Sequence, residues 1–126
     1  YSVNKGYENY LTKILEFHNS ENPISHINKH ELVKGDAIVE LEKYLKNHPE
    51  TIISLAYFDF DIYEPTRICL ELCRDRFTKG SVIGFDELNH PDWPGETLAL
   101  KETLGVNKVR IERFPFGSTM SYAVIE

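Results

Sequence analysis

The stretch from Thr51 to Thr66, TIISLAYFDFDIYEPT, decides the fold of this chain. Its first eight residues form a nearly continuous apolar run, which is typical of a strand buried on both faces in a parallel sheet. Pro65 then predicts the start of a helix, because the first helical position needs no amide hydrogen. A buried strand followed directly by a helix indicates an α/β fold.

The same pattern continues on both sides of this stretch. Helices are expected where apolar residues recur every three or four positions, at residues 6–18, 37–45, 65–77 and 95–104. Further strands are expected at residues 31–34, 81–85, 108–112 and 121–125. Gly80 is predicted to end the third helix as its C′ residue. The last two strands are joined by so short a turn that they must be antiparallel, so we predict a mostly parallel sheet ending in an antiparallel β-hairpin.

The composition is that of a globular domain. The chain has 126 residues, of which 41% are hydrophobic and 27% charged, and this argues against disorder. With 20 acidic and 14 basic residues the net charge is −6, which gives no general attraction to nucleic acid or membrane surfaces. Two cysteines, no visible secretory signal and no apolar run of about 18 residues favour a cytoplasmic protein.

Acidic residues concentrate directly after two neighbouring strands. Asp59, Asp61 and Glu64 follow the first strand, and Asp86 and Glu87 follow the second. Because the carboxyl ends of adjacent parallel strands lie about 5 Å apart, these carboxylates are expected to converge. Like charges held so close repel one another, and a divalent cation between them removes the repulsion. Oxygen ligands favour Mg²⁺, Ca²⁺ or Mn²⁺ over zinc.

Carboxylates after strands also cap helices or face water. The cation site is the favoured interpretation for Asp59, Asp86 and Glu87. For Asp61 and Glu64 both interpretations stay open, since a glutamate beside Pro65 also suits the positive end of the helix dipole.

Other residues of chemical interest each have two interpretations. His90 follows the second acidic pair and is a candidate general base or an ordinary loop histidine. Asp36 is a candidate ligand of a nucleoside or a helix N-cap. Trp93 offers a flat surface to a ligand ring or packs against the protein. For Cys69 and Cys73, four residues apart, we favour burial as small apolar side chains over metal binding.

Three segments together resemble the macrocin O-methyltransferase family: Leu55–Thr66 (LAYFDFDIYEPT), Lys79–Glu87 (KGSVIGFDE) and Pro94–Thr97 (PGET). This family comprises class I, S-adenosylmethionine-dependent, metal-dependent methyltransferases that act on sugar hydroxyls in antibiotics and related glycosides. The resemblance runs from about Lys34 to Glu126. It implies the C-terminal portion of the Rossmann-like class I methyltransferase fold, with a small sugar or glycoside as substrate.

The resemblance also implies roles for individual acidic residues. Asp59, Asp86 and Glu87 match the metal-binding acidic positions of the family, and the register leaves Asp61 as an alternative to Asp59. Asp36 matches a segment that lies near the adenine of the cofactor in the family.

The implied reaction uses S-adenosylmethionine and Mg²⁺ or another divalent cation. The cation lowers the pKa of a sugar hydroxyl, Asp59 or His90 takes the proton, and the alkoxide attacks the methyl group of the sulfonium.

One part of the family pattern has no counterpart in the chain. The glycine-rich loop that holds the methionine part of the cofactor is missing, and so are the first two strands. We therefore expect residues 1–126 to form a single partial domain, a fragment of a methyltransferase. The alternative is a truncated, non-catalytic α/β module that self-associates as a homo-oligomer or completes its sheet with a partner.

Overall fold

The computed structural model describes residues 4–117 and 119–126, and the chain divides into two compact units, Tyr1–Asp36 and Ala37–Glu126. The first unit contains α1 (Tyr7–Ser20), which forms where the apolar spacing predicts it. An ion pair of 2.9 Å between Lys34 Nζ and Glu8 Oε1 joins the end of this unit to α1.

The strand expected at residues 31–34 is a wrong prediction. These residues are exposed and belong to no sheet in the described chain. A strand needs a neighbour that accepts and donates its backbone hydrogen bonds, and none of the described strands pairs with this segment.

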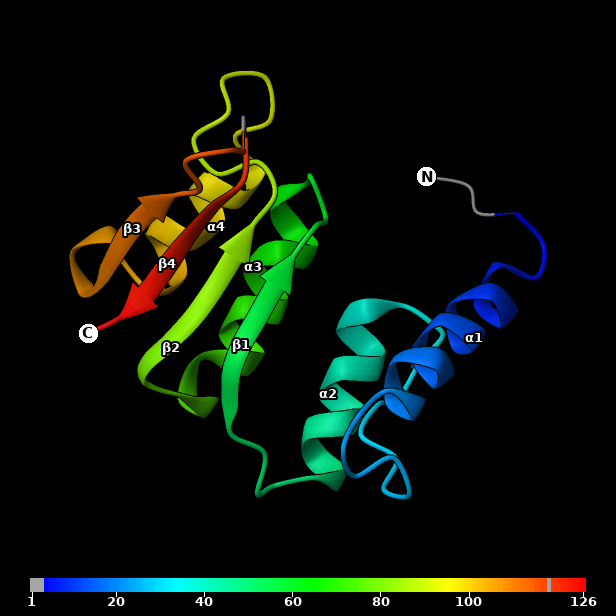
Figure 1. Ribbon diagram of the computed structural model, residues 1–126. Coiled ribbons are helices and arrows are strands. Elements are labelled where there is room, and N and C mark those ends of the chain that lie inside the picture. Colours follow the sequence, from blue (N-terminus) through cyan, green and yellow to red (C-terminus); the bar gives the residue numbers. More distant parts are fainter. Residues whose placement is uncertain (1–3, 118) are drawn as a thin grey trace. The chain divides into compact units, whose positions relative to one another are not determined.

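The second unit holds the sheet and its helices (Figure 1). Its elements are α2 (Ala37–Asn47), β1 (Ile53–Phe58), α3 (Tyr63–Cys73), η1 (Arg74–Arg76), β2 (Phe77–Phe85), α4 (Gly95–Thr103), η2 (Val106–Lys108), β3 (Val109–Arg113) and β4 (Ser121–Ile125). None of the helices described in the two units is long and apolar enough to cross a membrane.

The sheet is mixed, with the strand order β1-β2-β4-β3. β1 and β2 are parallel, whereas β4 is antiparallel to both β2 and β3. The closing β-hairpin is therefore confirmed, but a mostly parallel sheet is not found among the described strands. The reason lies in the hairpin itself, because its second strand turns back and inserts between β2 and β3.

Helices α3 and α4 lie on the same side of the sheet and cover one of its faces (Figure 1). Alternate residues of the strands point into this layer and are almost fully buried. The core side chains include Phe58, Ile83, Phe85 and Ala123 from the strands, Cys69 and Leu70 from α3, and Ala99 and Leu100 from α4.

The opposite face of β1 is not buried as the apolar run predicts. Leu55 is 67% exposed and Tyr57 is 52% exposed, while Phe58 on the core face is buried. β1 lies at the edge of the sheet in the described chain, so only one of its sides pairs with a described strand.

Two boundaries around α3 differ from the prediction. The helix begins at Tyr63, so Pro65 is its third residue, still within the first turn where amide hydrogens have no intrahelical acceptor. It ends at Cys73 rather than near Phe77. Gly80 is not a helix terminus: it lies inside β2 with φ 84°, where the pairing register with β1 shifts.

Candidate functional site

Parallel pairing of β1 and β2 brings the two acidic segments together. Phe58 and Phe85 are register partners at the ends of these strands, so Asp59 and Asp86 follow at the same end of the sheet (Figure 1). The Asp86 N–H donates a hydrogen bond of 3.2 Å to the Phe58 carbonyl oxygen, which extends the ladder by one residue. The two acidic segments therefore begin side by side, as the parallel pairing predicts.

Asp61 occupies a tight turn between β1 and α3. It has φ 61°, and the Ile62 N–H donates to the Phe60 carbonyl oxygen at 2.6 Å across it. Gly95 packs against this turn so closely that a Cβ atom would lie 2.8 Å from the Ile62 carbonyl carbon and 2.9 Å from the Asp61 carbonyl oxygen. The absence of a side chain at Gly95 thus allows the start of α4 to approach the acidic segments.

Glu96, the second residue of α4, is completely buried beneath these segments. Its Oε2 accepts a hydrogen bond of 2.9 Å from the Glu87 N–H, while its Oε1 has no hydrogen-bond partner among the residues that the structure describes. Burial raises the pKa of Glu96 to about 7. The hydrogen bond from the Glu87 N–H lowers this pKa, whereas the negative charges of Asp86, Glu87 and Asp61 raise it. A carboxyl with this pKa is partly protonated near neutral pH.

The neighbouring carboxyls show the repulsion that their convergence predicts. Burial raises the pKa of Asp59, and the charges of Asp86 and Asp61 raise it further. Burial also raises the pKa of Glu87. The charge of Asp61 raises it further, whereas His90 lowers it. We call the five residues that share this repulsion the carboxylate cluster: Asp59, Asp61, Asp86, Glu87 and Glu96.

Tyr57 holds Asp86 from the strand side. Its hydroxyl donates a hydrogen bond of 2.9 Å to Asp86 Oδ1. Its ring lies over Gly84 of β2, where an added Cβ atom would come within 2.6 Å of Tyr57 Cδ2. Partial burial, followed by the hydrogen bond and charge of Asp86, raises the pKa of Tyr57 to about 12, so the hydroxyl stays a donor at neutral pH.

His90 lies beside the cluster, in the loop between β2 and α4. Its backbone N–H donates to the Glu87 carbonyl oxygen at 3.1 Å, and its ring Nδ1 accepts a hydrogen bond of 3.2 Å from the Asp92 backbone N–H. A neutral imidazole that accepts at Nδ1 carries its proton at Nε2. His90 can therefore act as a base only at Nδ1, after the Asp92 hydrogen bond breaks. Trp93 in the same loop is half-exposed.

The structure does not add the other candidates to the carboxylate cluster. Asp36 belongs to the first unit and directly precedes α2, and its contact with a cofactor stays a prediction. Glu64 is an exposed residue in the first turn of α3. Cys69 and Cys73 are buried in the core as favoured, and burial raises the pKa of the Cys73 thiol to about 11.

The donor chemistry of the cluster fits a hard divalent cation. The four predicted ligands offer only carboxylate oxygens, and one of these, Glu87 Oε2, is buried without a hydrogen-bond partner among the described residues. Within residues 4–117 and 119–126, however, no three His, Cys, Asp or Glu side chains are arranged so that they could hold a metal ion. Cation binding by Asp59, Asp61, Asp86 and Glu87 therefore stays a prediction.

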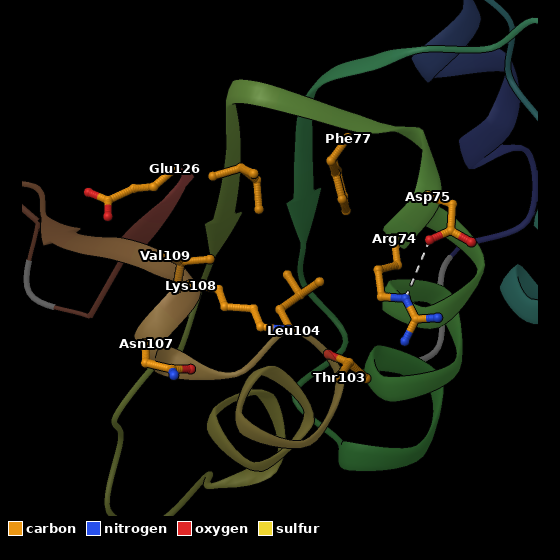
Figure 2. A pocket seen from close by; sticks show the side chains of 10 residues that line it. Arg74, Asp75, Phe77, Thr103, Leu104, Asn107, Lys108, Val109 and Glu126 are labelled. Atoms are coloured by element: carbon orange, nitrogen blue, oxygen red, sulfur yellow. Dashed lines mark ion pairs between the residues drawn. The ribbon is translucent and has the colours of Figure 1, made fainter.

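A cavity of about 620 Å³ lies at the opposite end of the sheet, near the first residues of β2 and β3 (Figure 2). Phe77, Leu104 and Val109 form part of its wall, and Arg74 and Asp75 form an ion pair of 3.5 Å at its side. None of the predicted site residues lines this cavity, so it is separate from the carboxylate cluster.

Tyr57 and Glu96 were given no role by the sequence analysis. A signal for Glu96 was present, because Glu96, Ala99, Leu100 and Leu104 recur with the spacing of a buried helix face. A glutamate on such a face must find a partner inside the protein. Tyr57 lies within the continuous apolar run of β1, and nothing in that run indicates a contact with Asp86.

The solved structures to which this chain is similar include two of the protein CalS11. No protein-family model and no curated protein sequence matches the chain. One similar structure is apo CalS11, a TDP-rhamnose 3′-O-methyltransferase of calicheamicin biosynthesis, with a TM-score of 0.87 and 38% identity over 98% of this chain and 53% of that chain. The other, of CalS11 as a calicheamicin methyltransferase, has a TM-score of 0.89 and 39% identity over 97% of this chain and 48% of that chain.

The chain thus spans about half the length of the solved relatives that it matches. Its α/β arrangement, with the mixed sheet and the helices on it, matches part of a methyltransferase fold. Over nearly all of its own length, the chain is similar in sequence and in structure to about half of a sugar O-methyltransferase.

Proposed function

We propose that this chain is part of an O-methyltransferase that transfers a methyl group from S-adenosylmethionine to a hydroxyl of a sugar or glycoside. The observation that carries this proposal is the 38% identity with a TDP-rhamnose 3′-O-methyltransferase over 98% of the chain, at a TM-score of 0.87. Because a fold alone does not imply function, the proposal also relies on the carboxylate cluster, whose chemistry suits the implied reaction.

The solved relatives contain about as much chain again outside the matched region. We propose that a corresponding segment supplies the glycine-rich loop for the methionine part of the cofactor, and that the present chain supplies the other side of the site. Asp36 is proposed to hydrogen-bond the nucleoside part of the cofactor.

The proposed cation site is formed by residues of the carboxylate cluster other than Glu96. Asp59, Asp86 and Glu87 would hold Mg²⁺ or another divalent cation, with Asp61 as the alternative to Asp59. Such a cation, when bound, lowers the pKa of a sugar hydroxyl. Tyr57 keeps Asp86 in place through its 2.9 Å hydrogen bond, so this ligand does not have to be ordered when the cation binds.

Two groups could take the proton from the sugar hydroxyl. Asp59 is exposed to an incoming hydroxyl, and partial desolvation with the charges of Asp86 and Asp61 raises its pKa. His90 can accept a proton at Nδ1 once its hydrogen bond from Asp92 is released. The remaining task of the chain is to position the hydroxyl in line with the methyl donor.

The proposal is tested by calorimetric titration with S-adenosylmethionine and with Mg²⁺. We expect Asp86→Asn to lower Mg²⁺ affinity by about 10-fold or more, because it removes one charged ligand. The matched control is Asp75→Asn, an exposed aspartate that lines the cavity at the other end of the sheet. An equal affinity in the wild type and in Asp86→Asn would exclude the proposed cation site.

The exposed edge of the sheet supports a second candidate, a non-catalytic module that binds a partner or a second copy of itself. Leu55 and Tyr57 are more than half exposed on β1, which has no strand on its outer side in the described chain. Light scattering of the wild type and of Leu55→Lys discriminates the two. A stable oligomer that Leu55→Lys disrupts, without binding of S-adenosylmethionine, would favour the module.

A further inference from the structure

We propose that Glu96 is a positioning residue, which fixes the path of the Asp86–Glu87 segment after β2 and does not itself bind the proposed cation. This inference rests on the proposed cation site and names a residue that the predicted ligand set does not contain.

The contact that carries the inference is the hydrogen bond of 2.9 Å from the Glu87 N–H to Glu96 Oε2. The two residues are nine positions apart, one being the second residue after β2 and the other lying in the first turn of α4. Glu96 therefore replaces the ladder hydrogen bond that Glu87 would make if the strand continued. It determines the direction in which the chain leaves β2.

Glu96 is held on a rigid support. It shares the buried face of α4 with Ala99 and Leu100, which are 0% and 1% exposed. Gly95, just before it, packs against the Asp61 turn with no room for a side chain. One helix start thus contacts both acidic segments, by van der Waals packing on one and by a hydrogen bond on the other.

Glu96 is more deeply buried than the proposed ligands. A cation that meets a sugar hydroxyl must lie where solvent and substrate reach it, and Asp59 is exposed while Asp86 and Glu87 are half-buried. Glu96 is 0% exposed, and its Oε2 is already occupied by the Glu87 amide. Its place is behind the ligands, as is usual for groups that orient metal ligands by hydrogen bonding.

A carboxylate at this position is costly unless its hydrogen bond is needed. An ionisable group without full hydrogen bonding is unfavourable inside a protein, and Glu96 Oε1 has no partner. A leucine or methionine would fill the same space in the apolar face of α4 at lower cost. The acceptor oxygen is the property that these residues lack.

A pair of variants of equal length tests the inference. Glu96→Gln retains an acceptor oxygen for the Glu87 N–H and removes the charge, whereas Glu96→Met retains the volume and removes the acceptor. In a titration of the full chain with Mg²⁺, Glu96→Met should bind Mg²⁺ about 10-fold or more weakly, the usual loss when a residue that hydrogen-bonds a metal ligand is removed. The Mg²⁺ affinity of Glu96→Gln should stay within about threefold of the wild-type affinity, because the acceptor oxygen remains.

The same variants have a readout that needs no cation. Hydrogen exchange of the Glu87 amide should be as slow in Glu96→Gln as in the wild type and faster in Glu96→Met, relative to amides in the centre of β2. Similar amide exchange in both variants would overturn the positioning role.

Three outcomes separate the inference from the function on which it rests. Equal loss of Mg²⁺ affinity in Glu96→Gln and Glu96→Met would show that the charge matters and that Glu96 is a ligand, which contradicts positioning. Unchanged affinity in Glu96→Met would also contradict it. Failure of the wild type to bind Mg²⁺ would instead overturn the cation site, while the Glu87 amide exchange would still decide whether Glu96 fixes this segment.

Discussion

The Tyr57 hydroxyl donates a hydrogen bond of 2.9 Å to Asp86 Oδ1, across the pair of parallel strands that defines the candidate site. Tyr57 is on β1, and Asp86 directly follows β2. On the other side, the Glu87 N–H is held by Glu96 of α4. The Asp86–Glu87 segment is therefore fixed from two directions, by a strand and by a helix.

Tyr57→Phe should weaken Mg²⁺ binding by about fivefold, since a hydrogen bond of this kind contributes about 1 kcal/mol. The fold should be retained, because the phenylalanine ring still covers Gly84. Calorimetric titration measures the effect. Tyr122→Phe is the matched control, because it removes a hydroxyl that donates to Glu112 on β3, away from the cluster. Equal losses in both variants would contradict a specific role for Tyr57.

The stability of the protein should fall as the pH rises from about 4.5 to about 7. Burial raises the pKa of Glu96 from 4.5 to about 7, so across this window the folded state keeps a proton that the unfolded state releases. Asp59 and Glu87 shift in the same direction.

Thermal melts without added metal at pH 5.5 and 7.5 measure this dependence. Glu96→Gln should reduce the difference between the two melting temperatures, because the side chain no longer titrates. Asp75→Asn, an exposed carboxylate elsewhere, should leave the difference unchanged. A difference that persists in full in Glu96→Gln would assign the pH dependence to other groups.

Gly95→Ala should lower the free energy of unfolding by about 1–3 kcal/mol, the usual cost of forcing atoms into filled space. The added Cβ atom would lie within 2.9 Å of three backbone atoms in the Asp61 turn. Helix propensity alone predicts that alanine increases the free energy of unfolding, whereas the close packing predicts a decrease. The sign of the measured change therefore distinguishes the two effects. Gly117→Ala, where the nearest atom would be 3.4 Å away, is the control in the same urea titration.

Arg76→Met should lower the free energy of unfolding by about 1–3 kcal/mol, because it leaves backbone acceptors without their charged donor. The Arg76 guanidinium donates to the Pro49 carbonyl oxygen at 2.5 Å and to those of His48 and Leu45 at 3.4 Å, just after and within the last turn of α2. Arg76→Lys should recover little of the free energy of unfolding that Arg76→Met loses, because one ammonium group cannot reach all three oxygens. Recovery of full stability in Arg76→Lys would contradict this account.

The elements that the sequence predicts well are those whose signal is local. Apolar periodicity and turn chemistry predict α1, α2, β1 and the closing hairpin, because each depends on residues close together in the chain. Asp59 and Asp86 could be predicted as neighbours since two consecutive strands joined by a helix are parallel and end at the same edge.

The features that escape prediction depend on distant neighbours. The apolar run of β1 indicates burial, yet the exposure of Leu55 depends on whether another layer covers it. Residues 31–34 form no strand, because no strand in the described part of the chain pairs with them. The burial of Glu96 is hard to predict, because a glutamate near the start of a helix is ordinarily a surface residue. Only its position on the apolar face of α4 indicates burial.

Methyl transfer is the most direct test of the central claim. Full-length protein is incubated with methyl-labelled S-adenosylmethionine, Mg²⁺ and a nucleotide-linked deoxysugar, and the sugar is analysed by mass spectrometry. We predict that one methyl group appears on a sugar hydroxyl, and that Asp86→Asn lowers the rate by about 10-fold or more while Asp75→Asn does not. Absence of label on the sugar, or equal rates for Asp86→Asn and the wild type, would contradict the account.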